Sequence, residues 1–235
     1  EKDEMKLRLS TARKQLYDLQ MKIKEHKIPV IVLFEGWGTS GKGSTISKVI
    51  RNIDPRFFKV ATMDEPTEEE KRKPFLYRYF VKIPAKGKLE FLDSGWMDEV
   101  VNGILHDDMG EKEYKKKIES VKRFERQLTD NGYLVMKFFF QISRKEQKKR
   151  IEVLKQDKDT RWRVSGGEDW QNKHYDKCLH VFDRYLNDTN APADPWYIID
   201  AKSRKWAELQ VLETLVSGIE TALKNSNLAV PLLQN

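Results

Sequence analysis

Continuous apolar runs alternate with segments of helical periodicity along most of the chain. Buried or half-buried strands are predicted where the residues are mainly apolar or β-branched, at 28–34, 58–62, 89–92, 133–142 and 196–200. Helices are predicted where apolar residues recur at helical spacing, at 4–26, 42–52, 71–80, 111–130, 143–155, 168–186 and 209–223. Strands that alternate with helices in this way indicate an α/β domain, with a parallel sheet covered by helices on both faces.

A glycine-rich turn directly follows the first predicted strand. Gly36, four further residues, Gly41 and Lys42 have the spacing of a phosphate-binding loop, and a predicted helix begins at Lys42. Such a loop lets backbone N–H groups surround an anion, and the helix N-terminus adds partial positive charge. The residues expected to bind phosphate are Gly36, Gly38, Gly41, Lys42, Gly43 and Ser44. A turn that binds nothing is the alternative.

Two side chains elsewhere are candidates for the same site. Asp93 ends the strand at 89–92, and the carboxyl ends of parallel strands face one crevice. We expect Asp93 to ligate a magnesium ion on the phosphates, the alternative being a helix cap. Arg78 lies in an aromatic and basic segment, and a guanidinium suits phosphate oxygens. A solvated helix face is the alternative for Arg78.

The polar, glycine-containing segment 157–170 is predicted to be mobile. It carries Arg161 and Arg163 on either side of Trp162. A phosphoryl-transfer site has to exclude water, and a mobile basic lid both does so and adds positive charge to the transition state. We therefore expect Arg161 and Arg163 to belong to a lid around 157–186. An exposed loop with no such role is the alternative.

The composition of the chain limits which classes of ligand and which cellular compartment are expected. The chain has 44 basic and 37 acidic residues, a formal charge of +7, which fits an anionic ligand. No alternation of aromatic and basic residues indicates a nucleic-acid surface, and no stretch approaches the ~20 apolar residues of a membrane span. The single cysteine, Cys178, excludes an internal disulfide and fits a reducing cytoplasm. The histidines show no metal-binding spacing.

Taken in order, the motifs resemble those of the family-2 polyphosphate kinases, which move phosphoryl groups between inorganic polyphosphate and nucleotides. The resemblance runs from about Gln20 to Leu223. The matching residues include Phe34, Glu35, Gly36, Gly41, Lys42, Gly43, Glu65, Pro66, Tyr77, Arg78, Asp93, Trp96, Phe124, Glu125, Asn131, Gly132, Lys137, Glu146, Gln147, Arg150, Arg161, Trp162, Arg163, Pro195, Trp196 and Asp200.

The resemblance implies a fold, a cofactor and roles for the candidate residues. The fold would be a three-layer α/β/α P-loop kinase fold, similar to thymidylate kinase, with a helical lid. The cofactor would be Mg²⁺, and the protein would carry a basic channel for polyphosphate, with the nucleotide site opposite, and form a dimer or tetramer. Lys42 would bind phosphates, Asp93 would be the Walker B carboxylate, and Arg78 would lie near the nucleotide. Arg161 and Arg163 would belong to the lid.

Two positions depart from the family pattern. Gly38 stands where the family usually has an aspartate, and Ser94 stands where it usually has an arginine. Asp64 and Asp98 are possible substitutes for the lost carboxylate. These departures resemble the amino-terminal half of the tandem polyphosphate:AMP phosphotransferases, and the absence of an initial Met and the apolar end of the chain lead us to expect a fragment.

We expect a helix over 1–27, a kinase-like domain over 28–224, and a tail or linker to a second domain over 225–235. The favoured function is phosphoryl transfer between polyphosphate and a nucleotide, from AMP to ADP or from ADP to ATP, weakened by the two departures. A catalytically degenerate polyphosphate-binding domain is one alternative. A nucleoside monophosphate kinase that uses ATP is the other.

Overall fold

The computed structural model describes residues 2–51, 53–63 and 65–229. Within them lies a five-stranded sheet in the order β2-β3-β1-β4-β5, and each neighbouring pair of strands is parallel. The strands are β1 (Val30–Gly36), β2 (Phe58–Thr62), β3 (Leu89–Asp93), β4 (Leu134–Gln141) and β5 (Trp196–Asp200). The prediction of a parallel α/β sheet is therefore confirmed.

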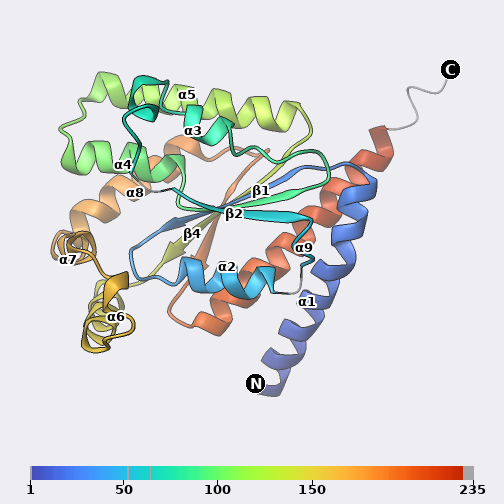
Figure 1. Cartoon of the computed structure of the whole chain (residues 1–235), viewed down its shortest axis with the longest axis horizontal. Helices are drawn as coiled ribbons and strands as arrows, with labels where there is room; N and C mark the ends of the chain where they lie inside the picture. Colours follow the sequence, from blue (N-terminus) through green and yellow to red (C-terminus); the bar gives the residue numbers. More distant parts are fainter. Residues whose placement is uncertain (1, 52, 64, 230–235) are drawn as a thin grey trace.

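Helices cover both faces of this sheet (Figure 1). The helices are α1 (Lys2–Glu25), α2 (Lys42–Ile50), α3 (Tyr77–Phe80), α4 (Trp96–His106), α5 (Glu111–Asp130), α6 (Arg144–Gln156), α7 (Gly166–Lys173), α8 (Tyr175–Thr189) and α9 (Arg204–Ala229), with 3₁₀ turns η1 (Glu70–Arg72) and η2 (Arg161–Arg163). One outer layer holds α1, α2 and α9, and the other holds α3, α4, α5 and α8. This is the expected three-layer α/β/α arrangement.

Two helix predictions need correction, and one helix was not predicted. The segment 71–80 is not one helix, because Pro74 forces Lys73 into an extended conformation and separates η1 from α3. The segment 168–186 is divided at His174 into α7 and α8. Helix α4 was not predicted, although its apolar residues recur at helical spacing and are buried. Helix α2 ends at Ile50, and Asn52 lies outside the described residues.

The lid segment, which we define as residues 157–186, contains more regular structure than its composition indicates. Helix α7 begins there with a capping box, in which the Ser165 hydroxyl accepts from the Gly167 N–H and Glu168 accepts from the Ser165 N–H. At the carboxyl end of the chain, α9 continues as far as Ala229, and residues 230–235 lie outside the described part.

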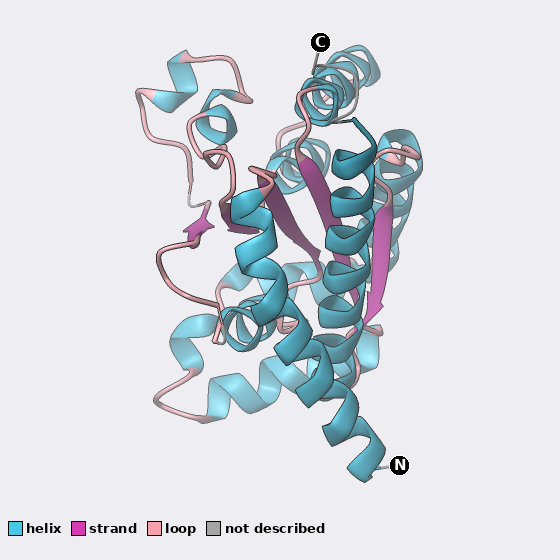
Figure 2. Cartoon of the chain, turned by 90° about the vertical axis from the view of Figure 1, so that its right-hand side faces the viewer, coloured by secondary structure: helices cyan, strands magenta, loops and turns pink. Residues whose placement is uncertain are grey.

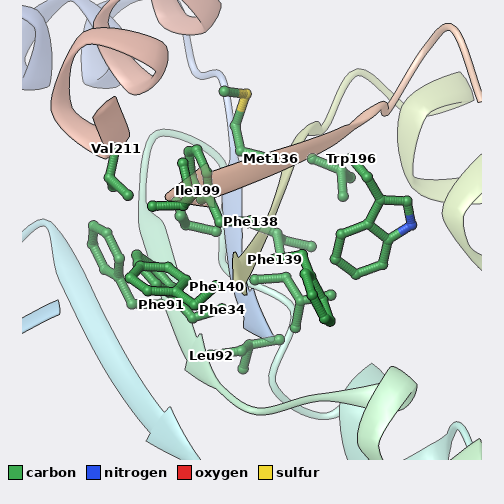
Figure 3. Packing of buried hydrophobic residues seen from close by; sticks show 14 of the residues in the cluster. Phe34, Phe91, Leu92, Met136, Phe138, Phe139, Phe140, Trp196, Ile199 and Val211 are labelled. Atoms are coloured by element: carbon green, nitrogen blue, oxygen red, sulfur yellow. The ribbon is translucent and has the colours of Figure 1, made fainter. Parts of the chain in front are cut away.

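Aromatic rings fill the space between the sheet and the layer that contains α9. The Phe34 ring centroid lies 5.6 Å from that of Phe138, 5.7 Å from that of Phe140 and 6.4 Å from that of Phe91. These rings come from three neighbouring strands and point to one face (Figure 3). Full burial of such side chains contributes roughly 1.5–3 kcal/mol each to folding.

Helix α1 packs along α9 rather than standing apart from the domain (Figure 2). Its apolar positions, such as Leu16 and Ile23, are buried, and Arg8 donates two hydrogen bonds to Glu213 of α9. Arg13 pairs with the buried carboxylate of Glu208, which also lies 3.4 Å from the Lys48 ammonium of α2. Across the described residues, no helix is both long and apolar enough to cross a bilayer.

A buried lysine connects β4 to the opposite helical layer. The Lys137 ammonium is fully buried and donates to Glu125 Oε2 at 2.9 Å, to Asp194 Oδ2 at 3.1 Å and to the Thr189 carbonyl at 3.0 Å. Trp96 Nε1 donates to the second Glu125 oxygen at 2.8 Å. Burial raises the pKa of Glu125, and Lys137 opposes that shift.

We predict that Lys137→Met lowers the free energy of unfolding by about 3–5 kcal/mol, because the carboxylates of Glu125 and Asp194 would remain buried without a cation. Chemical denaturation measures the change. The control is Lys148→Met on the exposed face of α6, which should stay within about 0.5 kcal/mol of the unaltered protein. Equal stability of the two variants would contradict this account of the buried cluster.

Candidate active site

The turn from β1 into α2 has a backbone that requires glycine at two positions. Gly36 has φ 121°, and a Cβ there would lie 2.5 Å from the Phe140 carbonyl oxygen. Gly41, at the N-cap of α2, has φ 101°. L-residues rarely adopt these values, so the glycines allow the chain to turn sharply and present its N–H groups at the helix N-terminus. The strand–loop–helix context predicted for the phosphate loop is present.

Lys42 and the phosphate loop face a pocket of about 760 Å³. The Lys42 ammonium donates to the Gly36 carbonyl at 3.3 Å, so its charge lies over the loop. Among the described residues, the buried hydroxyls of Thr39 and Ser40 have no hydrogen-bond partner. Such groups are costly to bury unless something satisfies them, and neither residue lines the pocket.

A buried arginine on α6 supports the loop from behind. The Arg150 guanidinium donates to the carbonyls of Thr39 at 3.3 Å and Ser40 at 2.7 Å. It also donates to the carbonyls of Ala201 at 2.7 Å and Lys202 at 3.0 Å, just after β5. A guanidinium carries several N–H donors in one plane, which suits it to hold carbonyls from two segments at once, and its Nε donates to Glu146 Oε1 at 2.8 Å.

Helix α7 docks directly on the loop at Gly38. The Gly38 N–H donates to Gln171 Oε1 at 2.9 Å, and Gln147 Nε2 donates to both Gln171 Oε1, at 2.6 Å, and the Gly38 carbonyl, at 3.3 Å. Gln147 is fully buried and also accepts from Asn172. The backbone of Gly38, expected to bind phosphate, is therefore engaged by the lid segment.

The same contact accounts for the absence of a side chain at position 38. A Cβ on Gly38 would lie 2.7 Å from Glu168 Cγ and 3.3 Å from Gln171 Oε1. A distance under 3 Å cannot be accommodated without movement, so an aspartate at this position requires the Glu168 side chain or α7 to shift. The space beside the loop is instead occupied by the side chain of Glu168, which also lines the pocket.

Carboxylates from β1, β3 and α4 surround Lys42. Asp93 ends β3 beside the first turn of α2, where a Cβ on Gly43 would lie 3.0 Å from its Oδ2. Burial raises the pKa of Asp93, and Lys42 opposes the shift. Asp98 lines the pocket. Loss of water around its carboxyl raises its pKa, Lys42 opposes the shift, and repulsion from Glu65 and Asp93 adds to it.

Glu35 orients the turn between β3 and α4. Its buried carboxylate accepts from the Met97 N–H at 3.2 Å, at the start of α4. Burial is the largest cause that raises the pKa of Glu35, followed by repulsion from Asp98. Ser94, in this turn, has φ 64°, a left-handed conformation that residues other than glycine seldom adopt. Glu35 thus fixes the helix end that carries Asp98.

Arg78 lies on α3 and faces the same pocket as Lys42. Its side chain is 9% exposed, its guanidinium lies 3.9 Å from Glu70, and it sits over the Tyr79 ring at 5.8 Å. The alternative of a solvated helix face is therefore wrong for Arg78. Tyr79 in turn donates to the Gly95 carbonyl at 3.0 Å, which joins α3 to the turn before α4.

The lid arginines lie apart from this pocket. Arg161 and Arg163 are exposed in η2, which packs against α6, and neither lines the pocket. The Arg163 guanidinium instead lies 5.2 Å from the centre of the Trp162 ring, which is 74% exposed. The part of the lid that does reach the pocket is α7, where Trp170 lies 4.3 Å from the His106 ring of α4.

No group of three or more His, Cys, Asp or Glu side chains in the described residues is arranged to hold a metal ion by itself. Asp93 is the predicted metal ligand and lies beside the first turn of α2, and Asp98, a possible substitute, lines the pocket at Lys42. Asp64, the other possible substitute, lies outside the described residues.

Comparison with known proteins identifies this arrangement. The family model described as Polyphosphate kinase 2 matches residues 1–227. The chain belongs to the polyphosphate kinase 2 family. A solved Polyphosphate Kinase 2 from Arthrobacter aurescens TC1 has a TM-score of 0.90 with 24% identity, over 94% of this chain and 80% of that one. This likeness confirms the fold.

Two curated relatives in the same family are named Polyphosphate:AMP phosphotransferase. The relative from Pseudomonas syringae is 32% identical over 92% of this chain and 43% of its own length. The relative from Pseudomonas aeruginosa is 29% identical over 95% of this chain and 45% of its own length. The chain therefore spans less than half the length of these relatives.

The features of this polyphosphate kinase 2 site that were not predicted from the sequence are its supports. They are Glu35 under the turn before α4, Arg150 behind the loop, and Gln147 and Gln171 between α6, α7 and Gly38. Three of them appear among the motifs of the family resemblance but without a role. The local signal is weak: Glu35 is a charged residue directly after an apolar predicted strand, and the others are ordinary polar residues of predicted helices.

We predict that Gly38→Ala displaces α7 from the phosphate loop, because the added Cβ collides with Glu168 Cγ. Hydrogen exchange at the α7 amides reports the free energy of this opening. In a double-mutant cycle with Glu168→Ala, the two changes should be coupled by about 1 kcal/mol or more, since removing Cγ relieves the collision.

Gly110→Ala is the matched control, because a Cβ there meets nothing within 4 Å. It should leave exchange in α7 unchanged. Purely additive effects of Gly38→Ala and Glu168→Ala would show that Glu168 does not occupy the space beside the loop.

Proposed function

We propose that this domain transfers a phosphoryl group between inorganic polyphosphate and a nucleotide, either AMP to form ADP or ADP to form ATP. The observation that carries the proposal is the glycine loop with Lys42, in a chain that belongs to the polyphosphate kinase 2 family. Relatives named polyphosphate:AMP phosphotransferase and AMP/ADP-polyphosphate phosphotransferase support AMP and ADP as acceptors.

Phosphoryl transfer depends on positioning and on the stabilisation of negative charge, and the pocket contains groups for both. Lys42 and the loop N–H groups would bind the phosphates of the donor. Arg78, which lines the same pocket, would hold the phosphate of the nucleotide acceptor. Helix α7 with Trp170 would close the pocket against water. Arg161 and Arg163 would contribute only if η2 moves toward the pocket.

The residues beside the loop fit a magnesium ion. Asp93 and Asp98 offer hard carboxylate oxygens next to Lys42 and the α2 N-terminus, and Mg²⁺ is commonly held by one or two carboxylates together with substrate phosphates. Held by these carboxylates, the ion would supply positive charge that offsets the negative charge developing during transfer. Asp93 would be the principal ligand. Asp98, positioned by Glu35, would be the second.

A second candidate is a polyphosphate-binding domain with weak transfer activity, one part of a longer tandem enzyme. A specific observation favours it: the Gly38 N–H is bonded to Gln171, and therefore is not directed at a ligand. Ser94 also offers no guanidinium to the transition state, and an arginine in that role is commonly worth orders of magnitude in rate. A cytoplasmic location and assembly into a dimer or tetramer remain predictions from composition and resemblance.

We predict that Lys42→Ala lowers kcat/KM for polyphosphate-dependent ADP formation by roughly 10²–10³-fold, the usual cost of removing one preorganised charge-stabilising group. The assay uses AMP, Mg²⁺ and polyphosphate, with ADP quantified by chromatography. Lys122→Ala, on the exposed face of α5, is the control and should keep the activity of the unaltered domain. Full turnover by a folded Lys42→Ala variant would rule out the proposed site. Measurable binding with no turnover in the unaltered domain would favour the second candidate.

A further inference from the structure

A second concavity lies far from the phosphate loop, and at about 1350 Å³ it is larger than the pocket at the loop. It is formed by α1, by the link from α2 to β2 and by the start of β3. Six cations line it: Arg13, Lys14, Lys24, Arg51, Arg56 and Lys88. Asp54 is the one carboxylate in the lining. We call this concavity the basic groove.

The charges of the two concavities are opposite. The basic groove has six cations and one carboxylate, a balance of +5, out of a formal charge of +7 for the whole chain. The pocket at Lys42 is lined by three cations and six carboxylates, a balance of −3. Most of the surplus positive charge is thus gathered in the groove, while the pocket itself repels a long polyanion except where Lys42, Arg78 and a cation attract it.

The cations of the basic groove are held on a fixed frame. The Asp54 N–H donates to the buried Gln20 of α1 at 2.9 Å, which fastens the link between α2 and β2 to that helix. Lys24 and Lys88 both lie against the Phe57 ring, with their ammonium groups 5.4 Å and 5.3 Å from its centre. These positions are therefore set before any ligand arrives.

Most of the cations keep their charge available to a ligand. Asp54 is bonded to Arg56, and Arg13 is bonded to Glu208 of α9, so two of the six are already neutralised. Within the described residues, no carboxylate forms an ion pair with Lys14, Lys24, Arg51 or Lys88. Four uncompensated cations along one groove form a track for phosphates.

The groove and the phosphate loop lie at opposite ends of the same helix. Helix α2 begins at Lys42 in the loop and ends at Ile50, next to Arg51 of the groove. Nine residues at 1.5 Å each separate the two ends by about 14 Å. A compact ligand cannot occupy both sites, whereas a long linear polyanion can reach from one to the other.

We propose that the basic groove binds a distant part of the inorganic polyphosphate chain and so anchors long polyphosphate to the domain. This inference rests on the proposed function for the identity of the polyanion. The groove lacks the row of exposed aromatic rings on which the bases of single-stranded nucleic acids stack: Phe57 is buried beneath lysines, and Tyr17 is the one exposed ring in the lining. Polyphosphate has no bases to stack, so the positive charges of the groove are enough to bind it.

The experiment compares two double variants of the whole chain that change its charge equally. Lys14→Glu/Arg51→Glu reverses two groove cations. Lys112→Glu/Lys122→Glu reverses two exposed lysines of α5, on the opposite helical layer. Equilibrium binding at low salt is measured for long-chain polyphosphate, tripolyphosphate and a single-stranded DNA oligonucleotide, with circular dichroism as the check on folding. Lys14→Gln/Arg51→Gln, which removes charge without reversing it, serves as the milder variant.

The groove reversal should weaken long-chain polyphosphate binding by about tenfold or more and reduce its salt dependence, since fewer counterions are released. Tripolyphosphate binding should be unchanged, and the milder variant should lie between. An equal loss in the α5 control, an equal loss for tripolyphosphate, no loss at all, or tighter binding of DNA than of polyphosphate would each overturn the inference.

The outcomes also separate this inference from the proposed function. If groove reversal weakens binding but the unaltered domain transfers no phosphoryl group, the groove is supported and the transfer activity fails. If Lys42-dependent turnover is normal and groove reversal changes neither the affinity nor the KM for long chains, the transfer activity stands and the groove inference fails.

Discussion

The contacts of Arg150 with backbone carbonyls hold together the elements on which the candidate site depends. One guanidinium joins α6, the phosphate loop and the link after β5, because it donates to the carbonyls of Ser40 and Ala201 at 2.7 Å each. Buried carbonyls must be paired, and Arg150 pairs those of Thr39 and Ser40 in the phosphate loop. The conformation of Gly36 and Gly41 makes such a turn possible, and Arg150 keeps it in place.

A second consequence of this arrangement is the placement of α7. Since α6 carries both Arg150 and Gln147, the helix that fixes the loop also fixes the docking point of α7 through Gln171. The loop and the lid segment therefore share one support. The charges follow the same division: carboxylates and Lys42 gather at the carboxyl edge of the sheet, and uncompensated cations gather at the far end of α2. In this account, phosphoryl transfer takes place in the pocket at Lys42, and the basic groove holds the distant part of the polyanion.

The sequence predicts those parts of the molecule that short-range rules govern. Strands β2 and β5 and helix α5 lie at the predicted residues, because apolar runs and a helical period of buried residues are local signals. The loop at Gly36–Ser44 is likewise local. The break at Pro74 is also a local signal, and the predicted helix over 71–80 is wrong because it runs through this proline. Helix α4 was overlooked, although the burial of Trp96 and Val100 follows a regular helical spacing.

The rest depends on contacts between residues far apart in the chain. Gly38 and Gln171 are separated by 133 positions, and Arg150 lies 110 positions from Ser40, so no sequence window contains either contact. Position 38 is an example. The sequence shows only that a carboxylate is missing there, whereas the fold shows that the side chain of Glu168 fills the space. Arg161 and Arg163 were assigned to a lid, but in the structure it is α7 that reaches the pocket.

The central claim is that this loop uses polyphosphate as the phosphoryl donor, and donor choice tests it most directly. The isolated domain is incubated with AMP and Mg²⁺, together with either polyphosphate or ATP, and the phosphorylated products are separated and quantified. The account predicts that polyphosphate supports ADP formation and that ATP in its place does not support phosphorylation of AMP. Phosphorylation of AMP by ATP, with none from polyphosphate, would contradict it.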